Sequence, residues 1–308
     1  YTGDRRMNMG EQIQRGNWID MIFRCLLPQI GFSVREDQVR MANVMYNGLV
    51  GKKVTLCEAG VGTGKTMAYL AAAFVASRMD GTYQYAANPI TISTSSIDLQ
   101  REIMEKEIPR LSQVLKNAGI LDRPLRAILR KGKEHYFCLR RYHDYLNGLM
   151  DAGEQYSDTL GLLDMLNLPV RGFDLDTVQL PSYVKAKICA SGSCRQCGYR
   201  NQCRYAQFLK QASANRKFDF QITNHNLLLT SQRLKNSTGH GVLLDSNYYI
   251  IDEAHQLLEA ANSVYGAEIT QDTIPDLLDS VKYAGKDKHT RKQYRQLLAR
   301  TLEKNADI

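Results

Sequence analysis

A stretch of small residues that ends in Gly-Lys-Thr carries the clearest chemistry in this 308-residue chain. It follows a short apolar run at residues 54–56, which we expect to be a strand, and precedes helix-forming residues 67–76. A turn of this kind lets backbone N–H groups converge on phosphate oxygens at the positive end of a helix. The predicted phosphate-binding loop comprises Ala59, Gly60, Val61, Gly62, Thr63, Gly64, Lys65 and Thr66, with Ala59 where the first glycine is usual.

Two acidic residues supply the other half of a nucleotide site. Lys65 can reach the β- and γ-phosphates of a nucleotide, and the Thr66 hydroxyl can bind magnesium. Asp252 and Glu253 follow the apolar run 248–251, so Asp252 can hold magnesium through water and Glu253 can polarise the attacking water. The alternative, a strand end followed by a helix N-cap pair, is outweighed because the phosphate loop requires such an acid. Lys65, Asp252 and Glu253 are therefore the predicted catalytic residues.

Other polar residues near predicted helix starts allow two readings. Gln38 lies in the first turn of a predicted helix, where its amide could read an adenine edge or simply face solvent. Thr94 ends a predicted strand at residues 89–94, and Ser95 follows it. Their hydroxyls can cap the next helix, or they can contact a nucleic-acid phosphate, since ligands bind at the carboxyl edge of an open α/β sheet.

Charge is concentrated in one segment. The chain carries a net charge of +8, and residues 185–217 contain eight basic residues and no acidic one, so the remainder nets to zero. Such clustering favours a polyanion, most simply nucleic acid, over an ordinary solvated surface. Residues 130–142 also interleave basic and aromatic side chains, which suits phosphates and stacked single-stranded bases. The candidate contacts there are Lys131, Lys133, Tyr136 and Arg140.

The chain also has seven cysteines. A phosphate loop belongs in a reducing cytosol, so clustered cysteines indicate metal or cluster ligation rather than disulfides. Cys25 and Cys57 are instead expected to be buried in the core. No apolar run approaches the roughly 20 residues that span a bilayer, and the acidic residues 151–176 are predicted to form a solvated spacer.

The fold class follows from hydrophobic periodicity. Helical spacing covers residues 18–26, 36–49 and 97–115, and β-branched or apolar runs predict strands at 89–94, 125–129, 218–223 and 248–251. Strands that alternate with helices predict an α/β fold, a P-loop (RecA-like) parallel sheet flanked by helices.

The order of these motifs resembles the superfamily-two DNA helicases of the DinG and XPD type. The resemblance runs from about residue 31 to residue 255. It rests on Gly31-Phe32 with Arg35 and Gln38, residues 58–66, Ser93-Thr94 with Leu99-Gln100, residues 131–138, Thr223-Asn224-His225, and Asp252-Glu253-Ala254-His255.

The resemblance implies an ATP- and magnesium-dependent helicase that acts on single-stranded DNA and duplex junctions, with 5′-to-3′ polarity. Arg35 and Gln38 would then bind adenine, Asn224 and His225 would contact DNA, and His255 would couple the two sites. It also implies a 4Fe–4S cluster on Cys138, Cys194, Cys197 and Cys203, with Cys189 as an alternative to Cys194. Zinc on the same thiolates is the rival, because Cys-x-x-Cys is also a zinc spacing.

The resemblance further implies a domain order. We expect a first part of a RecA-like motor domain at 1–129, an iron–sulfur insertion at 130–215, the second part of the motor domain at 216–258, and the start of a helical arch at 259–308. The second motor domain, whose arginine completes the ATP site, is missing, and no initiator Met is present, which indicates a piece of a longer protein. This piece alone is expected to hydrolyse ATP poorly.

Two other functions remain open. The chain could belong to a DinG-like accessory helicase of a CRISPR-type defence complex, which would share every motif. It could also be a non-catalytic, metal-stapled module that binds single-stranded nucleic acid. The expected location is the cytoplasm, at the nucleoid if the source is bacterial.

Overall fold

The structure is a computed structural model that describes residues 18–60, 62–78, 88–151, 173–191, 194, 196–213 and 218–266, together with 159, 161 and 163. The chain divides into two compact units after Ala260. Predictions for Val61 and for most of the segment 259–308 lie outside the described residues. In the described part, no helix is long and apolar enough to cross a membrane.

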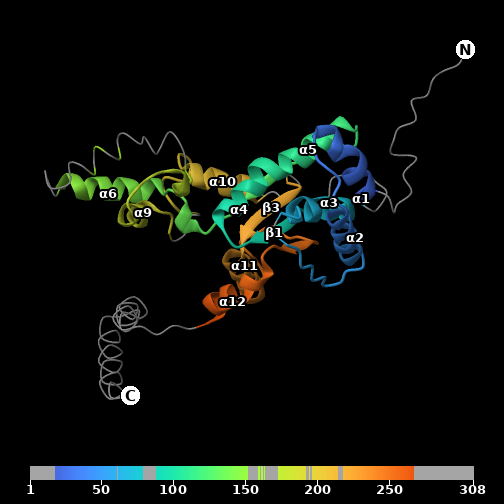
Figure 1. Cartoon of the computed structure of the whole chain (residues 1–308). Helices are drawn as coiled ribbons and strands as arrows, with labels where there is room; N and C mark the ends of the chain where they lie inside the picture. The colour runs from blue at the N-terminus through green and yellow to red at the C-terminus, as the bar shows by residue number, and fades with distance from the viewer. Residues whose placement is uncertain are drawn as a thin grey trace, which may run out of the picture. The chain divides into compact units, whose positions relative to one another are not determined.

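Four parallel strands form one sheet in the order β2-β3-β1-β4 (Figure 1). They are β1 (Ile90–Thr94), β2 (Ala127–Leu129), β3 (Phe220–Asn224) and β4 (Tyr249–Ile251). All of β1 and the first four residues of β3 are buried, as is typical of parallel strands whose two faces are covered. The four predicted strands at 89–94, 125–129, 218–223 and 248–251 and the α/β class are confirmed.

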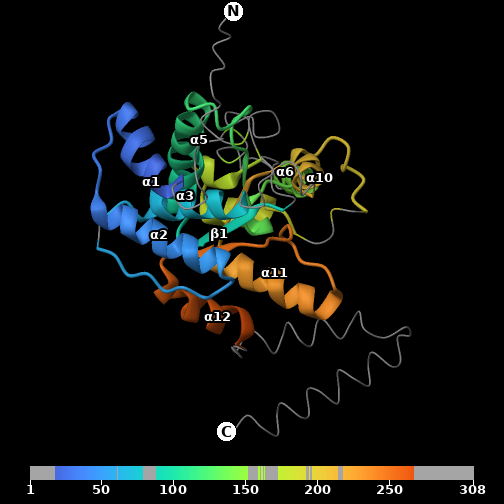
Figure 2. The same ribbon diagram turned by 90° about the vertical axis from the view of Figure 1, so that its right-hand side faces the viewer.

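Helices cover both faces of this sheet. In Figures 1 and 2, α5 lies above it and α11 lies below it. The helices of the sheet region are α1 (Trp18–Met21), η2 (Ile22–Leu26), η3 (Leu27–Ile30), α2 (Glu36–Val50), α3 (Lys65–Ser77), α4 (Ile97–Glu102), η4 (Ile103–Glu107), α5 (Ile108–Asn117), α11 (His225–Thr238), η9 (Ala254–Gln256) and α12 (Leu257–Tyr265).

The main core forms around α3. Its ten residues 67–76 are all buried, because alanine and larger apolar side chains surround the whole helix and leave no polar face. The predicted apolar face before it is confirmed, with Ile19, Ile22 and Phe23 buried in the same core. The expectation for Cys25 is wrong: its side chain is exposed, because it lies with Arg24 on the outward arc between Phe23 and Leu26.

The strand predicted at residues 54–56 is also wrong. These residues form neither helix nor strand, and Val54 and Leu56 are 96% and 88% exposed. Lys52 has a left-handed backbone with φ of 51°, which turns the chain away from the end of α2. A run of three residues with no neighbouring strand has nothing to accept its ladder hydrogen bonds, so the phosphate loop is reached through an extended segment.

The segment between β2 and β3 builds two small apolar clusters apart from the main core. Its described elements are η5 (Lys133–His135), α6 (Leu139–Asp151), η7 (Leu175–Thr177), α9 (Ser182–Ile188) and α10 (Arg204–Ala212). The prediction of a solvated spacer fails at residues 173–176. Leu175 is buried, and the carboxylates of Asp174 and Asp176 accept hydrogen bonds from Lys131.

Candidate nucleotide site and insertion

The phosphate loop ends where α3 begins at Lys65. Gly62 and Gly64 adopt φ values of 81° and 83°, a conformation that glycine enters without steric cost. The Thr63 hydroxyl donates to the Gly60 carbonyl at 2.9 Å. The loop therefore has the tight backbone expected of a phosphate cradle, with the N-terminus of a long buried helix behind it.

Two side chains from the start of α2 brace this loop. The Gln38 amide donates to the Gly64 carbonyl at 2.8 Å, and the Arg35 guanidinium donates to the Gly62 carbonyl. A Cβ atom at Gly64 would collide with the Gln38 amide, so the two residues fit closely. Sequence reasoning assigned Arg35 and Gln38 to adenine, and that role stays a prediction. The structure adds that both donate to loop carbonyls, which the spacing did not indicate.

The acidic pair lies opposite Lys65. The Lys65 ammonium is 3.3 Å from a Glu253 carboxylate oxygen, although 188 positions separate the two residues. Asp252 is held at the end of β4, where its backbone N–H donates to the Ser93 carbonyl at 2.8 Å. Glu253 has a left-handed backbone with φ of 53°, an uncommon conformation for a residue with a side chain. The predicted catalytic residues thus come together at one edge of the sheet.

Burial changes the acidity of Asp252. The pKa of Asp252 is raised, first by burial and then by the neighbouring Glu253 carboxylate, while Lys65 opposes the change. Tyr69, which sequence reasoning missed, places its phenol 3.5 Å from the Asp252 carboxylate. Burial raises the pKa of Tyr69 well above its usual range, and a hydrogen bond with the Thr66 side chain opposes this. Tyr69 therefore links Thr66 and Asp252, the two predicted magnesium ligands.

His225 lies behind the acidic pair. It is 3% exposed, and its Nδ1 shares a 2.7 Å hydrogen bond with the Ser93 hydroxyl. Burial lowers the pKa of His225, against the effect of the nearby Asp252 and Glu253 backbones, so the ring is neutral at pH 7. The Asn224 side chain accepts from the Leu227 N–H at 2.8 Å and caps α11. The structure therefore buries His225 and places Asn224 at the carboxyl end of β3 as the cap of α11.

Other predicted contacts at this edge differ in exposure. Thr94 is fully buried, Ser95 is half-buried, and the helix cap is Ser96, which accepts from the Leu99 N–H. The buried Thr94 hydroxyl has no hydrogen-bond partner among the described residues. His255 is exposed, with its ring 3.4 Å from the Glu253 carboxylate. Its coupling role stays a prediction.

The basic and aromatic residues after β2 divide into two groups. Lys133 and Arg140 are exposed, whereas Lys131 and Tyr136 are buried. The Lys131 ammonium lies 2.7 Å from both Asp174 and Asp176. The Tyr136 ring stacks on other aromatic side chains, 4.7 Å from the Tyr205 ring between centroids. The structure thus leaves Lys133 and Arg140 accessible to nucleic acid and places Lys131 and Tyr136 inside the insertion.

Three of the cysteines, Cys138, Cys194 and Cys203, pack in the same small apolar cluster between β2 and β3. The pKa of Cys194 is raised, mainly by burial and then by the thiols of Cys138, Cys203 and Cys197. Cys189 faces elsewhere, since its sulfur lies 3.4 Å from an Arg141 nitrogen and 3.5 Å from the Ala186 carbonyl. Among the described residues, no group of three or more His, Cys, Asp or Glu side chains could hold a metal ion.

The parallel sheet, the phosphate loop and the facing acidic pair together define a P-loop nucleotide-binding α/β domain. No protein-family model matches the chain. Named relatives include the ATP-dependent DNA helicase YoaA of Escherichia coli K12, which is 30% identical over 264 residues, covering 82% of this chain and 38% of the relative. The ATP-dependent helicase DinG of Mycobacterium tuberculosis H37Rv is 27% identical over 265 residues, covering 80% of this chain and 38% of the relative.

A third relative, the probable ATP-dependent helicase YpvA of Bacillus subtilis 168, is 28% identical over 283 residues, covering 85% of this chain and 41% of the relative. The chain spans about two-fifths of the length of these curated relatives. It is a homologue of the DinG-type ATP-dependent helicases, as its motifs predicted.

Proposed function

We propose that the chain forms the nucleotide-binding part of an ATP-dependent DNA helicase that moves along single-stranded DNA, in the 5′-to-3′ direction by analogy with its family. The observation that carries the proposal is the approach of Lys65 to Glu253 at 3.3 Å, beside Asp252 at the end of β4. A phosphate-binding lysine, a magnesium ligand and a water-orienting carboxylate are the parts that hydrolysis of a nucleoside triphosphate needs. The names of the relatives support the same reaction class.

In this proposal each residue has one task. The loop amides and Lys65 bind the β- and γ-phosphates, while Thr66 and Asp252 hold magnesium, the second of them through water. Glu253 orients the attacking water. Burial raises the pKa of Asp252, which disfavours the charged carboxylate. A bound magnesium ion would favour the charged form again, because an opposite charge offsets the cost of burial. An arginine from a second motor domain would complete the charge stabilisation.

The test compares Lys65→Ala with Lys53→Ala in the full-length protein. Lys53 is exposed and precedes the same loop in the chain, so its replacement removes the same charge. We expect DNA-stimulated ATP hydrolysis to fall about 100-fold or more in Lys65→Ala, as when a transition-state donor is removed, and to change little in Lys53→Ala. Unwinding of a duplex with a 5′ tail that survives Lys65→Ala would overturn the proposal. Tight DNA binding without any ATP hydrolysis in the unaltered protein would instead favour the non-catalytic module.

We also propose that Cys138, Cys194, Cys197 and Cys203 hold an iron–sulfur cluster, which would cross-link the segment between β2 and β3. Four thiolates are the donor set of a 4Fe–4S cluster. Cys138, Cys194 and Cys203 pack in one apolar cluster while Cys189 packs in another, which supports this set over one containing Cys189. Cys194→Ser and Cys189→Ser form a matched pair of variants. After anaerobic purification we expect about four irons per chain in the unaltered protein and in Cys189→Ser, and loss of iron in Cys194→Ser. A colourless protein that contains zinc would exclude the cluster and leave the ATPase proposal standing.

A further inference from the structure

His225, the first residue of α11, has no task in the proposed ATP hydrolysis, and its burial leaves little surface for DNA to contact. Its Nδ1 shares a hydrogen bond with the Ser93 hydroxyl. Its Nε2 is buried and has no hydrogen-bond partner among the described residues. A buried polar atom without a partner is costly and uncommon in folded proteins, so the unpartnered ring nitrogen needs an explanation.

The strand register places His225 beside the acidic pair. β1 lies between β3 and β4, and its Ser93 is opposite both Thr223 of β3 and Ile251 of β4. Because the three strands are parallel, the residues that follow them gather at one edge of the sheet. His225 follows the end of β3 and the acidic pair follows the end of β4. The backbone of the acidic pair lies close enough to the ring to raise its pKa against the effect of burial.

Ser93 contacts both groups. Its hydroxyl bonds to His225 Nδ1 at 2.7 Å, and its carbonyl accepts from the Asp252 N–H at 2.8 Å. A neutral imidazole carries its proton on one nitrogen only, and carbonyl groups accept but do not donate. The carbonyls beside the ring therefore favour the proton on Nε2, with the Ser93 hydroxyl donating to Nδ1. In this tautomer the unpartnered nitrogen is a hydrogen-bond donor.

The acidic pair has a backbone that needs support. Glu253 has a left-handed backbone with φ of 53°, and such a conformation persists only where the surroundings fix it. The turn directs the Glu253 carboxylate to within 3.3 Å of the Lys65 ammonium. The Gln256 N–H donates to the Glu253 carbonyl at 3.0 Å, and a carbonyl oxygen can accept a second hydrogen bond. A donor beside this turn would therefore hold the carboxylate in place.

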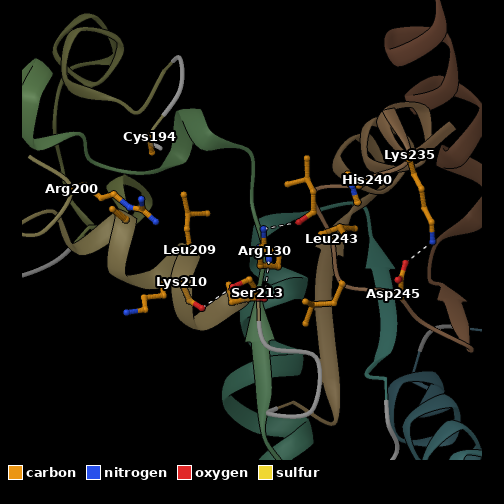
Figure 3. Close-up of a pocket in the computed structure, with 16 residues that line it drawn as sticks. Arg130, Cys194, Arg200, Leu209, Lys210, Ser213, Lys235, His240, Leu243 and Asp245 are labelled. Atoms are coloured by element: carbon orange, nitrogen blue, oxygen red, sulfur yellow. Dashed lines mark hydrogen bonds and ion pairs between the residues drawn. The ribbon is translucent and has the colours of Figure 1, made fainter. Parts of the chain in front are cut away.

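Helix α11 is fastened to the connection that leads into β4. Figure 3 shows Lys235, near the end of the helix, paired with Asp245 of this connection. One turn earlier, the Ser231 hydroxyl accepts from the N–H groups of Val242 and Leu243 at 3.0 and 2.9 Å. These contacts hold the helix, and with it the histidine at its start, against the part of the chain that carries the acidic pair.

We propose that His225 is a positioning residue for ATP hydrolysis: when nucleotide binds, its Nε2–H donates to a backbone carbonyl of the acidic pair and fixes the turn that aims the Glu253 carboxylate. This inference rests on the proposed function of the acidic pair. The movement required is small, because the ring and this backbone already lie side by side. The role differs from the DNA contact that the sequence predicted for His225.

The test compares His225→Gln with His225→Asn in the full-length protein. The amide nitrogen of glutamine takes the place of Nε2, whereas the shorter asparagine reaches only the place of Nδ1. We expect His225→Asn to lower kcat of DNA-stimulated ATP hydrolysis about 10- to 100-fold, as for a misplaced reacting group. His225→Gln should keep kcat within about fivefold of the unaltered protein, as for one imperfect hydrogen bond. The KM for ATP should change little in both variants.

Hydrogen exchange gives a readout that does not depend on hydrolysis. With the non-hydrolysable analogue AMP-PNP and magnesium, a peptide that contains Asp252 and Glu253 should exchange about tenfold faster in His225→Asn than in the unaltered protein. Leu228→Ala is the structural control, because this residue is buried in the same helix and has no polar group to offer the acidic pair. It should lower the thermal midpoint and leave kcat and the exchange of this peptide nearly unchanged.

Three outcomes would overturn the proposal. One is an equal kcat of the two His225 variants, which would mean that the contact with Ser93 is sufficient. Another is exchange of the acidic-pair peptide that is the same in every variant. The third is weaker binding of oligothymidylate with kcat unchanged at saturating DNA, which would support the DNA contact instead. If the unaltered protein hydrolyses no ATP, the proposed function fails, while exchange with AMP-PNP still tests the position of the acidic pair.

Discussion

Replacing Lys131 by Met separates two roles for a lysine that the sequence assigned to DNA binding. The Lys131 ammonium is 3% exposed and lies 2.7 Å from both Asp174 and Asp176. Methionine keeps most of the apolar stem and removes the charge, so the two carboxylates would face each other without a cation between them. Lys133→Met is the matched control, because that lysine is two positions away and exposed.

The expected cost follows from burial. Removing one partner of a buried ion pair costs about 3–5 kcal/mol of stability. Asp174 and Asp176 keep 27% and 20% exposure, so water can partly solvate them and we expect the lower end, about 3 kcal/mol. Lys133→Met should stay within about 0.5 kcal/mol of the unaltered chain, as for other surface changes.

Urea unfolding combined with hydrogen exchange of peptides from α9 and α10 would measure this loss in the insertion. Oligonucleotide binding of the same variants provides the contrast. The reasoning is refuted if Lys131→Met leaves stability and exchange unchanged but weakens binding more than Lys133→Met does. That result would support the original assignment of Lys131 as a surface contact to nucleic-acid phosphate.

The same contact predicts a pH dependence. Burial alone would raise the pKa of Asp176, but hydrogen bonds from Lys131 and His135 outweigh it, so the pKa is lowered from its ordinary value of 3.8. A lowered carboxylate pKa stabilises the folded state above the ordinary value, and this contribution is lost as the pH falls through the folded value. The difference in urea midpoint between the unaltered chain and Lys131→Met should therefore shrink below about pH 4.

Three further predictions concern other contacts of the buried interior. His225→Ala and Ser93→Ala should each lower kcat of ATP hydrolysis with little change in the KM for ATP, measured by steady-state kinetics, since the Ser93 hydroxyl holds the His225 ring beside the backbone of the acidic pair; a rise in KM alone would contradict this positioning role. Tyr69→Phe should raise the magnesium concentration needed for half-maximal ATP hydrolysis about two- to tenfold, in line with the loss of one hydrogen bond. An unchanged magnesium titration would exclude the link to Asp252. Asp219→Asn should destabilise the chain by about 3 kcal/mol in urea unfolding, because Asp219 is 6% exposed and ion-paired with two arginines; a change below about 0.5 kcal/mol would count against that network.

Local patterns predicted the sheet well and indicated residues that the structure brings together at one of its edges. β1 consists mainly of β-branched residues, so its own sequence predicts a strand. Lys65 follows closely spaced glycines, which are typical of a tight turn, so the residues next to it predict the phosphate loop. Parallel pairing then brings Asp252 to the same edge, because the carboxyl ends of parallel strands lie together. The strand prediction at residues 54–56 was wrong because it lacked such pairing: three apolar residues form a strand only if a neighbouring strand pairs with them.

Contacts between distant residues could not be read from the sequence. Lys131 looked like a surface cation because its neighbours in the chain are basic and aromatic, whereas its partners Asp174 and Asp176 lie more than 40 positions away. Tyr69 looked like an ordinary core residue of an apolar helix, and its phenol meets Asp252 only after folding. Such pairs depend on tertiary packing, which periodicity does not encode.

The fit between Gly64 and Gln38 restricts the order in which these two positions can change. Any side chain at position 64 would displace the Gln38 amide from its hydrogen bond, and the φ of 83° would remain unfavourable for most residues. Shortening Gln38 first removes the collision but not the backbone cost, so asparagine is the best-tolerated successor of Gly64. A mutational path through this loop must therefore alter position 38 before position 64, and the two sites are expected to show strong epistasis.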